Sequence, residues 1–380
     1  MPRLSFLLRL PVVLLLAHVY VALRLGQAAP AAQPWVTALV LTLIYGLILG
    51  GFFVRRSTGS KGGDALAWAG FLCLGLFSWL FVLTVLRDIL LLLLAGISWS
   101  GAFVRWDVSL WTSRAVPWLA LLAVVIGFIN ARRVARVHDV TIAVPGLPSA
   151  LQGFRIVQLS DVHVGPTIKA GYVNAIVDAA NALQPDVIAL TGDLVDGSVV
   201  QLQRHTHPFG RLVARHGVYA VTGNHEYYSG ARQWVAELQR LGIDVLMNEH
   251  RVLHHRDERL VLAGVTDFNA AAFDPEQASN PQAAAANAPA GVPRVLLAHQ
   301  PRSAPAAQAA GFDVQLSGHT HGGQFWPWNF FVPLQQPFVA GLHRLGSLQV
   351  YVSRGTGYWG PPMRLGARSE ITRIRLVKAG

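Results

Sequence analysis

The sequence predicts an α-helical membrane module of about four spans in residues 1–136, followed by an α/β domain in residues 137–380. Hydrophobic residues make up 52% of the chain and charged residues only 13%, which is typical of a protein with membrane spans. The first part holds twelve of the 31 lysines and arginines and three of the 20 acidic residues, beside long apolar runs. All but one of the 14 histidines lie in the second part, where short β-like runs alternate with helical patterns. We therefore expect the chemistry of this protein in its second part.

Four apolar segments of the first part are candidate membrane spans. A helix needs roughly 20 apolar residues to cross a bilayer core about 30 Å thick. The segments that approach this length, each nearly free of charge, lie at about residues 7–25, 35–53, 66–86 and 116–131. The apolar run Ile89–Val104 is disfavoured as a fifth span, because the two residues between it and the third span are too few for a turn in the membrane.

Basic residues flank these spans unevenly. They lie between the second and third spans and directly after the fourth, whereas the linker Gly26–Pro34 has no charge. By the positive-inside rule, the N-terminus, residues 54–63 and everything after residue 131 face the cytoplasm. We therefore expect a multi-pass protein of a bacterial-type inner membrane with its α/β domain on the cytoplasmic side. A fifth span would place that domain outside; Ala28–Ala32 resembles a signal-peptide cleavage site, but the three later spans favour a retained anchor.

The distribution of charge and cysteine excludes two other classes of protein. Residues 137–380 contain 19 basic and 17 acidic residues, so most of the net charge of +11 belongs to the membrane part. A nucleic-acid-binding face would need its positive charge on the folded domain, and no nucleic acid or protein partner is predicted. The single cysteine, Cys73, lies in an apolar run, which excludes a disulfide framework and a cysteine-based zinc site.

Alternating apolar and helical patterns predict the elements of the second part in order. Strands are expected at residues 154–159, 187–191, 218–222, 252–265 and 295–298, with closing strands at 347–353 and 371–377. Helices are expected at residues 168–183 and 231–241, and residues 270–291 look like a flexible surface loop rich in alanine, asparagine, proline and glutamine. Ligands of α/β sheets gather beyond the carboxyl ends of strands, so polar residues at those ends are candidate site residues.

Five polar clusters follow candidate strands. In chain order they contain Asp161 and His163; Asp193 and Asp196; Asn224, His225 and Glu226; His299; and His319 and His321. The order Asp-x-His, Gly-Asp-x-x-Asp, Gly-Asn-His-Glu, His, Gly-His-x-His resembles the full pattern of the calcineurin-like metallophosphoesterases over about residues 150–325. The resemblance implies a four-layer αββα sandwich and a metal-dependent hydrolase that cleaves a phosphodiester or pyrophosphate bond.

The donor atoms of these clusters suit a pair of divalent metal ions. Carboxylates, imidazoles and one amide, without a thiolate, favour Mn, Fe or Zn, and two such ions need a bridging carboxylate. Carried over position by position, the resemblance implies Asp161, His163 and His321 as ligands of the first metal, Asn224, His299 and His319 as ligands of the second, and Asp193 as the bridge.

His225 is the predicted catalytic residue. The resemblance implies that it stabilises the transition state or protonates the leaving oxygen. The alternative is a histidine that only supports a neighbouring ligand. Asp196 and Glu226 are expected to orient ligand imidazoles by accepting their second N–H.

The histidines and arginines outside these motifs are expected to be ordinary residues. Surface or loop positions are predicted for His205, His207, His216, His250, His254, His255 and His343. Arg302, Arg354 and Arg364 are possible phosphate contacts, but ordinary surface positions are the preferred interpretation.

The substrate is predicted to be a phosphate ester linked to a lipid. Residues Gly318–Gln324 and the aromatic, proline-rich residues 325–333 resemble the membrane-associated bacterial branch that includes UDP-2,3-diacylglucosamine pyrophosphatases. Aromatic side chains in such a loop suit a membrane interface or acyl chains, and a tethered domain stays close to the lipid bilayer. The alternatives are a phosphodiesterase or phosphatase for small soluble esters and a non-catalytic membrane sensor or scaffold. The complete set of ligands with His225 argues against the last.

Overall fold

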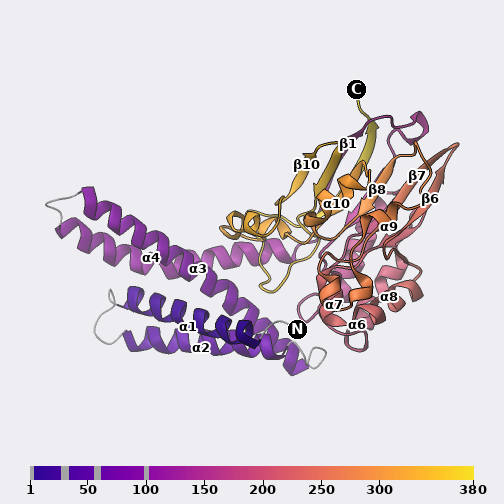
Figure 1. The fold of residues 1–380 in the computed structure, drawn as a ribbon. Coiled ribbons are helices and arrows are strands. Elements are labelled where there is room, and N and C mark those ends of the chain that lie inside the picture. Colours follow the sequence, from indigo (N-terminus) through magenta and orange to yellow (C-terminus); the bar gives the residue numbers. More distant parts are fainter. Residues whose placement is uncertain (1–3, 27–33, 55–60, 98–101) are drawn as a thin grey trace. The chain divides into compact units, whose positions relative to one another are not determined.

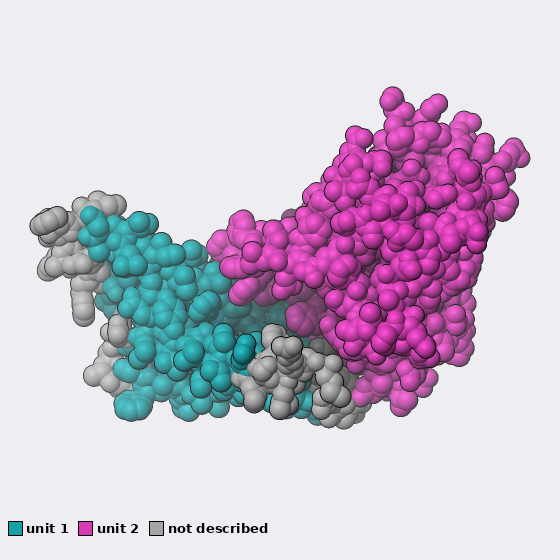
Figure 2. Space-filling view, in the orientation of Figure 1, with its two compact units in different colours: residues 1–129, 360–363 teal, residues 130–359, 364–380 magenta. Residues whose placement is uncertain are grey.

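The computed structural model describes residues 4–26, 34–54, 61–97 and 102–380 (Figure 1). The chain forms two compact units (Figure 2), of which unit 1 comprises residues 1–129 and 360–363 and unit 2 comprises residues 130–359 and 364–380. The predicted domain boundary at residue 136 lies near this division and stays a prediction.

Unit 1 is formed by four long apolar helices. They are α1 (Leu4–Gly26), α2 (Pro34–Val54), α3 (Lys61–Ile97) and α4 (Ala102–Arg132), the last of which continues into unit 2. Each is long and apolar enough to cross a membrane, as expected for four spans. Residues 89–97 continue α3, because the backbone stays helical through Arg87 and Asp88. Among the described residues they therefore form no separate fifth span.

Three charged residues within these helices, Arg24, Arg87 and Asp88, have paired side chains. Arg24 Nε lies 2.6 Å from Asp88 Oδ2, and the Tyr20 hydroxyl donates to the same oxygen at 2.7 Å. Arg87 donates to the Ser109 hydroxyl at 2.8 Å. Pairing of this kind is expected because a charge among apolar helices is costly unless a partner satisfies it.

Unit 2 contains two six-stranded sheets. In spatial order the first sheet comprises β1 (Arg136–Val144), β12 (Glu370–Lys378), β2 (Arg155–Leu159), β3 (Val187–Leu190), β4 (Val218–Ala220) and β5 (Asp244–Val245). The second comprises β10 (Gly341–Leu345), β11 (Leu348–Val352), β9 (Val314–Ser317), β8 (Arg294–Leu297), β7 (Glu258–Gly264) and β6 (Glu249–His255). Strands β2 to β5 run parallel, as do β7, β8, β9 and β11. The parallel strands therefore end at a common edge of each sheet.

The sheets pack face to face and are covered by helices on their outer faces (Figure 1). The helices of this unit are α5 (Ala170–Ala182), α6 (Val199–Thr206), α7 (Asn224–Ser229), α8 (Ala231–Arg240), α9 (Pro281–Ala285) and α10 (Ala304–Ala309). In β3, Val187 and Ala189 join the core between the sheets, whereas Ile188 and Leu190 join the core under the helices. The period of two along a strand therefore produces three buried layers, and the expected αββα sandwich is confirmed.

Two predicted segments differ from the structure. The single strand expected at residues 252–265 is a hairpin of β6 and β7, which turns at Arg256 with a positive φ of 54°. The loop expected at residues 270–291 contains two 3₁₀ turns and helix α9, whose first turn is capped by the Asn280 side chain accepting from Ala283 N. The six polar residues 254–259 mark the turn, which a single strand cannot accommodate, and the alanine-rich composition hid the cap.

Candidate metal centre

The seven predicted metal ligands come from loops that follow neighbouring strands. Asp161 and His163 follow β2, Asp193 follows β3, Asn224 follows β4, His299 follows β8, and His319 and His321 follow β9. Because these strands are central in the two packed sheets, their carboxyl ends bring the side chains together at one edge of the sandwich. Each ligand apart from His319 is buried, and His319 is half-buried.

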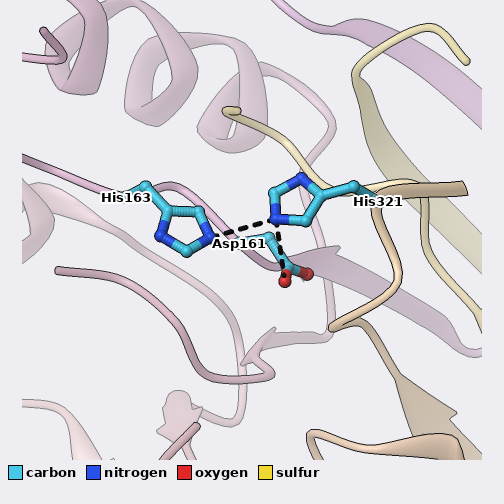
Figure 3. Close-up of side chains that lie close together, drawn as sticks. All are labelled: Asp161, His163 and His321. Atoms are coloured by element: carbon cyan, nitrogen blue, oxygen red, sulfur yellow. Dashed lines mark hydrogen bonds and ion pairs between the residues drawn. The ribbon is translucent and has the colours of Figure 1, made fainter. Parts of the chain in front are cut away.

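The first cluster contains Asp161, His163 and His321 (Figure 3). The Nε2 atoms of His163 and His321 lie 3.0 Å apart, and His321 Nε2 lies 3.5 Å from Asp161 Oδ1. Figure 3 shows the two imidazoles facing each other above the carboxylate. These are the three side chains expected at the first metal.

The second cluster contains Asp193, His299 and His319. His299 Nε2 lies 3.2 Å from Asp193 Oδ2 and 3.2 Å from His319 Nδ1. His299 Nδ1 donates to the Thr191 carbonyl at 2.8 Å, which leaves Nε2 facing the cluster. Asp193 Oδ2 also lies 3.9 Å from His163 Nε2 of the first cluster. This carboxylate therefore lies between the two clusters, where a bridging ligand is expected.

The donor atoms fit a pair of divalent cations. Among the side chains that the structure describes, Asn224 Oδ1 is buried without a hydrogen-bond partner, which is costly unless a cation accepts its lone pairs. A ring nitrogen of His163 faces one of His321, and a ring nitrogen of His299 faces one of His319. Because two facing nitrogens can share only one proton, at least one of them presents an unprotonated lone pair to the centre. Imidazole nitrogens and carboxylate or amide oxygens are ligands of Mn, Fe and Zn.

The charges of the centre are strongly coupled. Burial disfavours an ionised Asp193, but the imidazoles of His299 and His225 outweigh burial and hold the pKa of Asp193 well below its usual range. Burial likewise disfavours a charged His299, and the Asp193 carboxylate outweighs it and raises the pKa of His299. Burial, with the charge of His299 nearby, lowers the pKa of His319 to about 3. Negative charge is therefore concentrated on Asp193, between the clusters.

His225 lies beside the two clusters with one ring nitrogen fixed. Its Nδ1 donates to Asp196 Oδ1 in a short hydrogen bond, so Nε2 faces the centre, 3.9 Å from Asp193 Oδ2. Its backbone N–H donates to Asp193 Oδ1 at 2.8 Å. Asp196 Oδ1 also lies 3.3 Å from His163 Nδ1. Asp196 thus hydrogen-bonds the predicted catalytic imidazole, whereas it only lies near the predicted ligand His163, whose Nδ1 has no hydrogen-bond partner among the described side chains.

Glu226 does not orient an imidazole, contrary to the expectation. Its carboxylate accepts the backbone N–H groups of Gly223 at 2.6 Å, Asp193 at 2.9 Å and Leu194 at 2.7 Å. The physical reason is its place in the first turn of α7, where backbone N–H groups are free and the helix dipole favours a carboxylate. Glu226 therefore ties the loop that carries Asp193 to the loop that carries Asn224.

Close packing of these loops requires glycine at two positions. A Cβ atom on Gly223 would collide with the Asp193 carboxylate, and one on Gly318 would collide with Ser160 and with the Asp161 carboxylate. The backbone of the ligands is itself strained. Positive φ angles occur at Asp161, His163, Asp193, His319 and His321. Each costs about 1 kcal/mol, which the surrounding packing and hydrogen bonds must offset.

Arg364 has a role at the centre that the sequence did not reveal. It is 1% exposed, so the expected surface position is wrong, and burial lowers its pKa to about 10. Its guanidinium donates to the carbonyls of His321 at 2.9 Å and Gly357 at 3.1 Å, and NH2 lies 3.0 Å from His321 Nδ1. A side chain occupied in this way supports the His321 loop and is not a phosphate contact. Only the three-dimensional proximity of residues 321, 357 and 364 could have identified it.

One further side chain, His255, differs from its expected surface position. His255 is 4% exposed, and its Nδ1 lies 2.9 Å from His216 Nε2. Both belong to a group with Asp186, which precedes β3 and so lies at the opposite end of that strand from Asp193. Arg354 is partly exposed and pairs with Glu370 at 3.0 Å.

Comparisons with known proteins agree with this geometry. The family model of the calcineurin-like phosphoesterases matches residues 154–323. A "Transmembrane protein with metallophosphoesterase domain" from Danio rerio is 35% identical over 401 residues, which cover 99% of this chain and 90% of that protein. A protein of the same description from Bos taurus is 40% identical over 67% of this chain and 60% of its own length. An "Uncharacterized metallophosphoesterase" from Helicobacter pylori strain J99 is 36% identical over 59% of this chain and 60% of its own length.

The chain belongs to the calcineurin-like metallophosphoesterases. It is a membrane-associated, metal-dependent phosphoesterase, and the family and class of enzyme expected from the sequence are confirmed. Calcineurin-like phosphoesterases use two divalent metal ions, and the two His/Asp clusters could hold them. The assignment of each ligand, and of Mn in particular, stays a prediction.

Proposed function

We propose that this protein hydrolyses a phosphodiester or pyrophosphate bond of a lipid-linked substrate, such as a UDP-diacylglucosamine, at the cytoplasmic face of a bacterial-type inner membrane. The observation that carries the proposal is the position of Asp193 between two clusters of ligands, with His225 beside it. A bridging carboxylate and an adjacent imidazole are what a phosphoryl displacement at two metals requires.

The side chains divide the work as follows. One metal would be held by Asp161, His163 and His321, and the other by Asn224, His299 and His319. Asp193 would be a ligand of both metals. Bound there, the metal pair supplies Lewis acidity toward the phosphoryl oxygens and lowers the pKa of a water nucleophile. The neutral Asn224 amide leaves the site with more net positive charge than a further carboxylate would, which favours an anionic phosphate.

His225 holds the proton that the leaving oxygen requires. Asp196 accepts from Nδ1, so the second nitrogen, Nε2, is the one directed toward the reacting group. The same carboxylate stabilises the imidazolium form, from which Nε2 can donate. Arg364 and Glu226 position the backbone of the ligand loops and contact no substrate in this proposal.

The lipid-linked substrate is supported by membrane association and by the aromatic residues after the last ligands. Phe330 and Phe331 are exposed at the surface of unit 2, and such side chains suit an interface or acyl chains. The similar proteins come from animals as well as bacteria. That range favours a class of lipid-linked phosphoesters broader than one bacterial glycolipid.

Hydrolysis of two substrates by the detergent-solubilised full chain tests the proposal. A UDP-linked diacyl sugar and bis-p-nitrophenyl phosphate are compared with Mn added and with chelator present. We expect release of UMP from the lipid with Mn, and its loss with chelator and in Asp193→Ala. Turnover of the chromogenic diester alone would contradict the lipid-linked substrate and favour small soluble esters. Inactivity on both, with metal bound, would contradict the catalytic assignment.

A further inference from the structure

Three exposed aromatic side chains lie around His225, and none of the roles proposed above uses them. Tyr228, Phe273 and Trp359 are 57%, 48% and 42% exposed. Tyr228 belongs to α7, and Phe273 directly follows the 3₁₀ turn Ala270–Ala272. Trp359 lies in the connection between β11 and β12. Large exposed apolar side chains grouped beside a buried polar centre are typical of a ligand-binding surface.

The rings form a connected series through His225. The imidazole lies 5.1 Å from the Tyr228 ring and 5.9 Å from the Trp359 ring, at interplanar angles of 60° and 75°. Tyr228 in turn lies 5.5 Å from Phe273. Since Asp196 occupies Nδ1 of the imidazole, Nε2 is the nitrogen left for a proton transfer, and it belongs to the ring that Tyr228 and Trp359 contact.

The ligand loops themselves hold two of the rings. Gln324 lies three residues after His321, and its side chain makes two hydrogen bonds of 2.9 Å with the backbone N–H and carbonyl of Trp359. Tyr228 lies in α7, whose first residue is Asn224. The backbone positions of Trp359 and Tyr228 are therefore fixed relative to the metal ligands by short, local connections, which favours a pre-organised subsite.

We propose that Tyr228, Phe273 and Trp359 form an aromatic subsite that binds a flat ring, such as a nucleobase or an aryl group, on the leaving group of the phosphoester. This inference rests on the proposed function in one respect, namely that His225 serves the leaving oxygen. None of the three side chains is positively charged, so they do not suit an anionic head group. Aromatic rings attract another ring by stacked and edge-to-face contacts beyond the burial of area, which a flexible acyl chain cannot match.

Binding of phosphonates to the Mn-loaded full chain in lipid nanodiscs tests the aromatic subsite. Phenylphosphonate, methylphosphonate and octylphosphonate carry the same charged group, and calorimetry gives each dissociation constant without turnover. We expect phenylphosphonate to bind about 10-fold more tightly than methylphosphonate, as for one stacked ring. In Trp359→Ala this ratio falls to about 2 or less while the affinity for methylphosphonate is kept.

Matched variants separate the subsite from a general loss of structure. Trp359→Phe keeps a ring and should retain most of the preference, and Gln324→Ala should weaken it without removing a ring. Phe331→Ala removes a 54% exposed ring that contacts Trp328, and it should leave the ratio unchanged. Metal content is measured for every variant, so that a lost preference with two metals bound is assigned to the subsite.

Two results would overturn the proposal. An unchanged ratio in Trp359→Ala would show that the rings do not bind the substituent, and tighter binding of octylphosphonate that Trp359→Ala abolishes would make this an acyl subsite. The outcome is independent of hydrolysis. A Trp359-dependent preference in a protein without turnover would refute the proposed function alone, and turnover without any preference would refute the subsite alone.

Discussion

At the scale of single residues, one carboxylate decides which nitrogen of His225 can act. Asp196 accepts from Nδ1 and thereby directs Nε2 toward the centre. The carboxylate also favours a charged imidazole, so it contributes both direction and charge. An amide in its place keeps the shape of the side chain and loses the charge.

We therefore expect Asp196→Asn to lower kcat by about 10- to 100-fold, with close to two metals still bound. The measurement is kcat on bis-p-nitrophenyl phosphate together with metal content by mass spectrometry. In His225→Asn the further change Asp196→Asn should have little effect, because residues that act as a unit are not additive. Equal losses in both backgrounds would show that Asp196 acts through another group, such as His163.

A second prediction at this scale concerns Gly223. A Cβ atom there would collide with the Asp193 carboxylate, so Gly223→Ala displaces the predicted bridging ligand. We expect the variant to bind less than one metal per chain at concentrations that saturate the wild type, with activity reduced at least about 100-fold. The matched control is Gly171→Ala in α5, where a Cβ atom meets nothing within 4 Å. Full metal binding by Gly223→Ala would contradict the central position of Asp193.

Most residues of the centre could be predicted from the sequence because their chemistry is local. Asp161 and His163 are two positions apart, as are His319 and His321, so each motif is visible in a short segment. The roles of Trp359 and Arg364 could not be predicted, because each depends on a partner that is distant in the sequence. Trp359 is held by Gln324, about 35 positions away, and Arg364 contacts His321, about 43 positions away. Glu226 was assigned to imidazoles because its backbone partners in another loop are also distant in the sequence.

At the scale of elements, the strands that carry the ligands were the most predictable. Strand β3 consists entirely of buried apolar residues, and such a run predicts a parallel strand covered on both faces. The hairpin of β6 and β7 differs from the single predicted strand, although the six consecutive polar residues 254–259 between its apolar stretches mark the turn. Pairing order cannot be obtained from such runs, since β12, from the end of the chain, pairs with both β1 and β2.

The contact between His216, just before β4, and His255, the last residue of β6, predicts a dependence of stability on pH. Burial lowers the pKa of both His216 and His255, with Arg215 adding to the effect and Asp186 opposing it. The folded protein therefore binds fewer protons at these rings than the unfolded chain. The free energy of unfolding should fall as the pH drops below the ordinary value of 6.5.

Thermal unfolding of the full chain in detergent at pH 7.5 and pH 5.5 checks this sign. The decrease in melting temperature on acidification should be smaller in the double variant His216→Gln/His255→Gln than in the wild type, because the variant has lost these two groups. His254→Gln, at an exposed neighbouring position, is the control and should behave as the wild type. An equal decrease in all three proteins would show that the pair does not titrate between these pH values.

At the scale of the whole molecule, four apolar helices and a metallophosphoesterase domain occur in one chain. The Danio rerio relative is similar over nearly the full length of this chain, so the similarity covers both parts. The identity and number of the helices could be predicted because length and apolar composition determine a span. Their predicted orientation follows from a few basic residues that flank the spans, and labelling of the two sides of the membrane tests it.

The single native cysteine makes that measurement simple. In a Cys73→Ala background, one cysteine is introduced at Gln27 in the uncharged linker or at the exposed Gly380, and intact spheroplasts are treated with a membrane-impermeant maleimide. We expect labelling of Gln27→Cys in intact spheroplasts and of Gly380→Cys only after permeabilisation, because an even number of spans returns the chain to the cytoplasm. The reverse pattern would place the catalytic domain outside. It would remove cytoplasmic nucleotide-linked lipids from the possible substrates while leaving the metal centre unchanged, so the topology decides the substrate class independently of the chemistry.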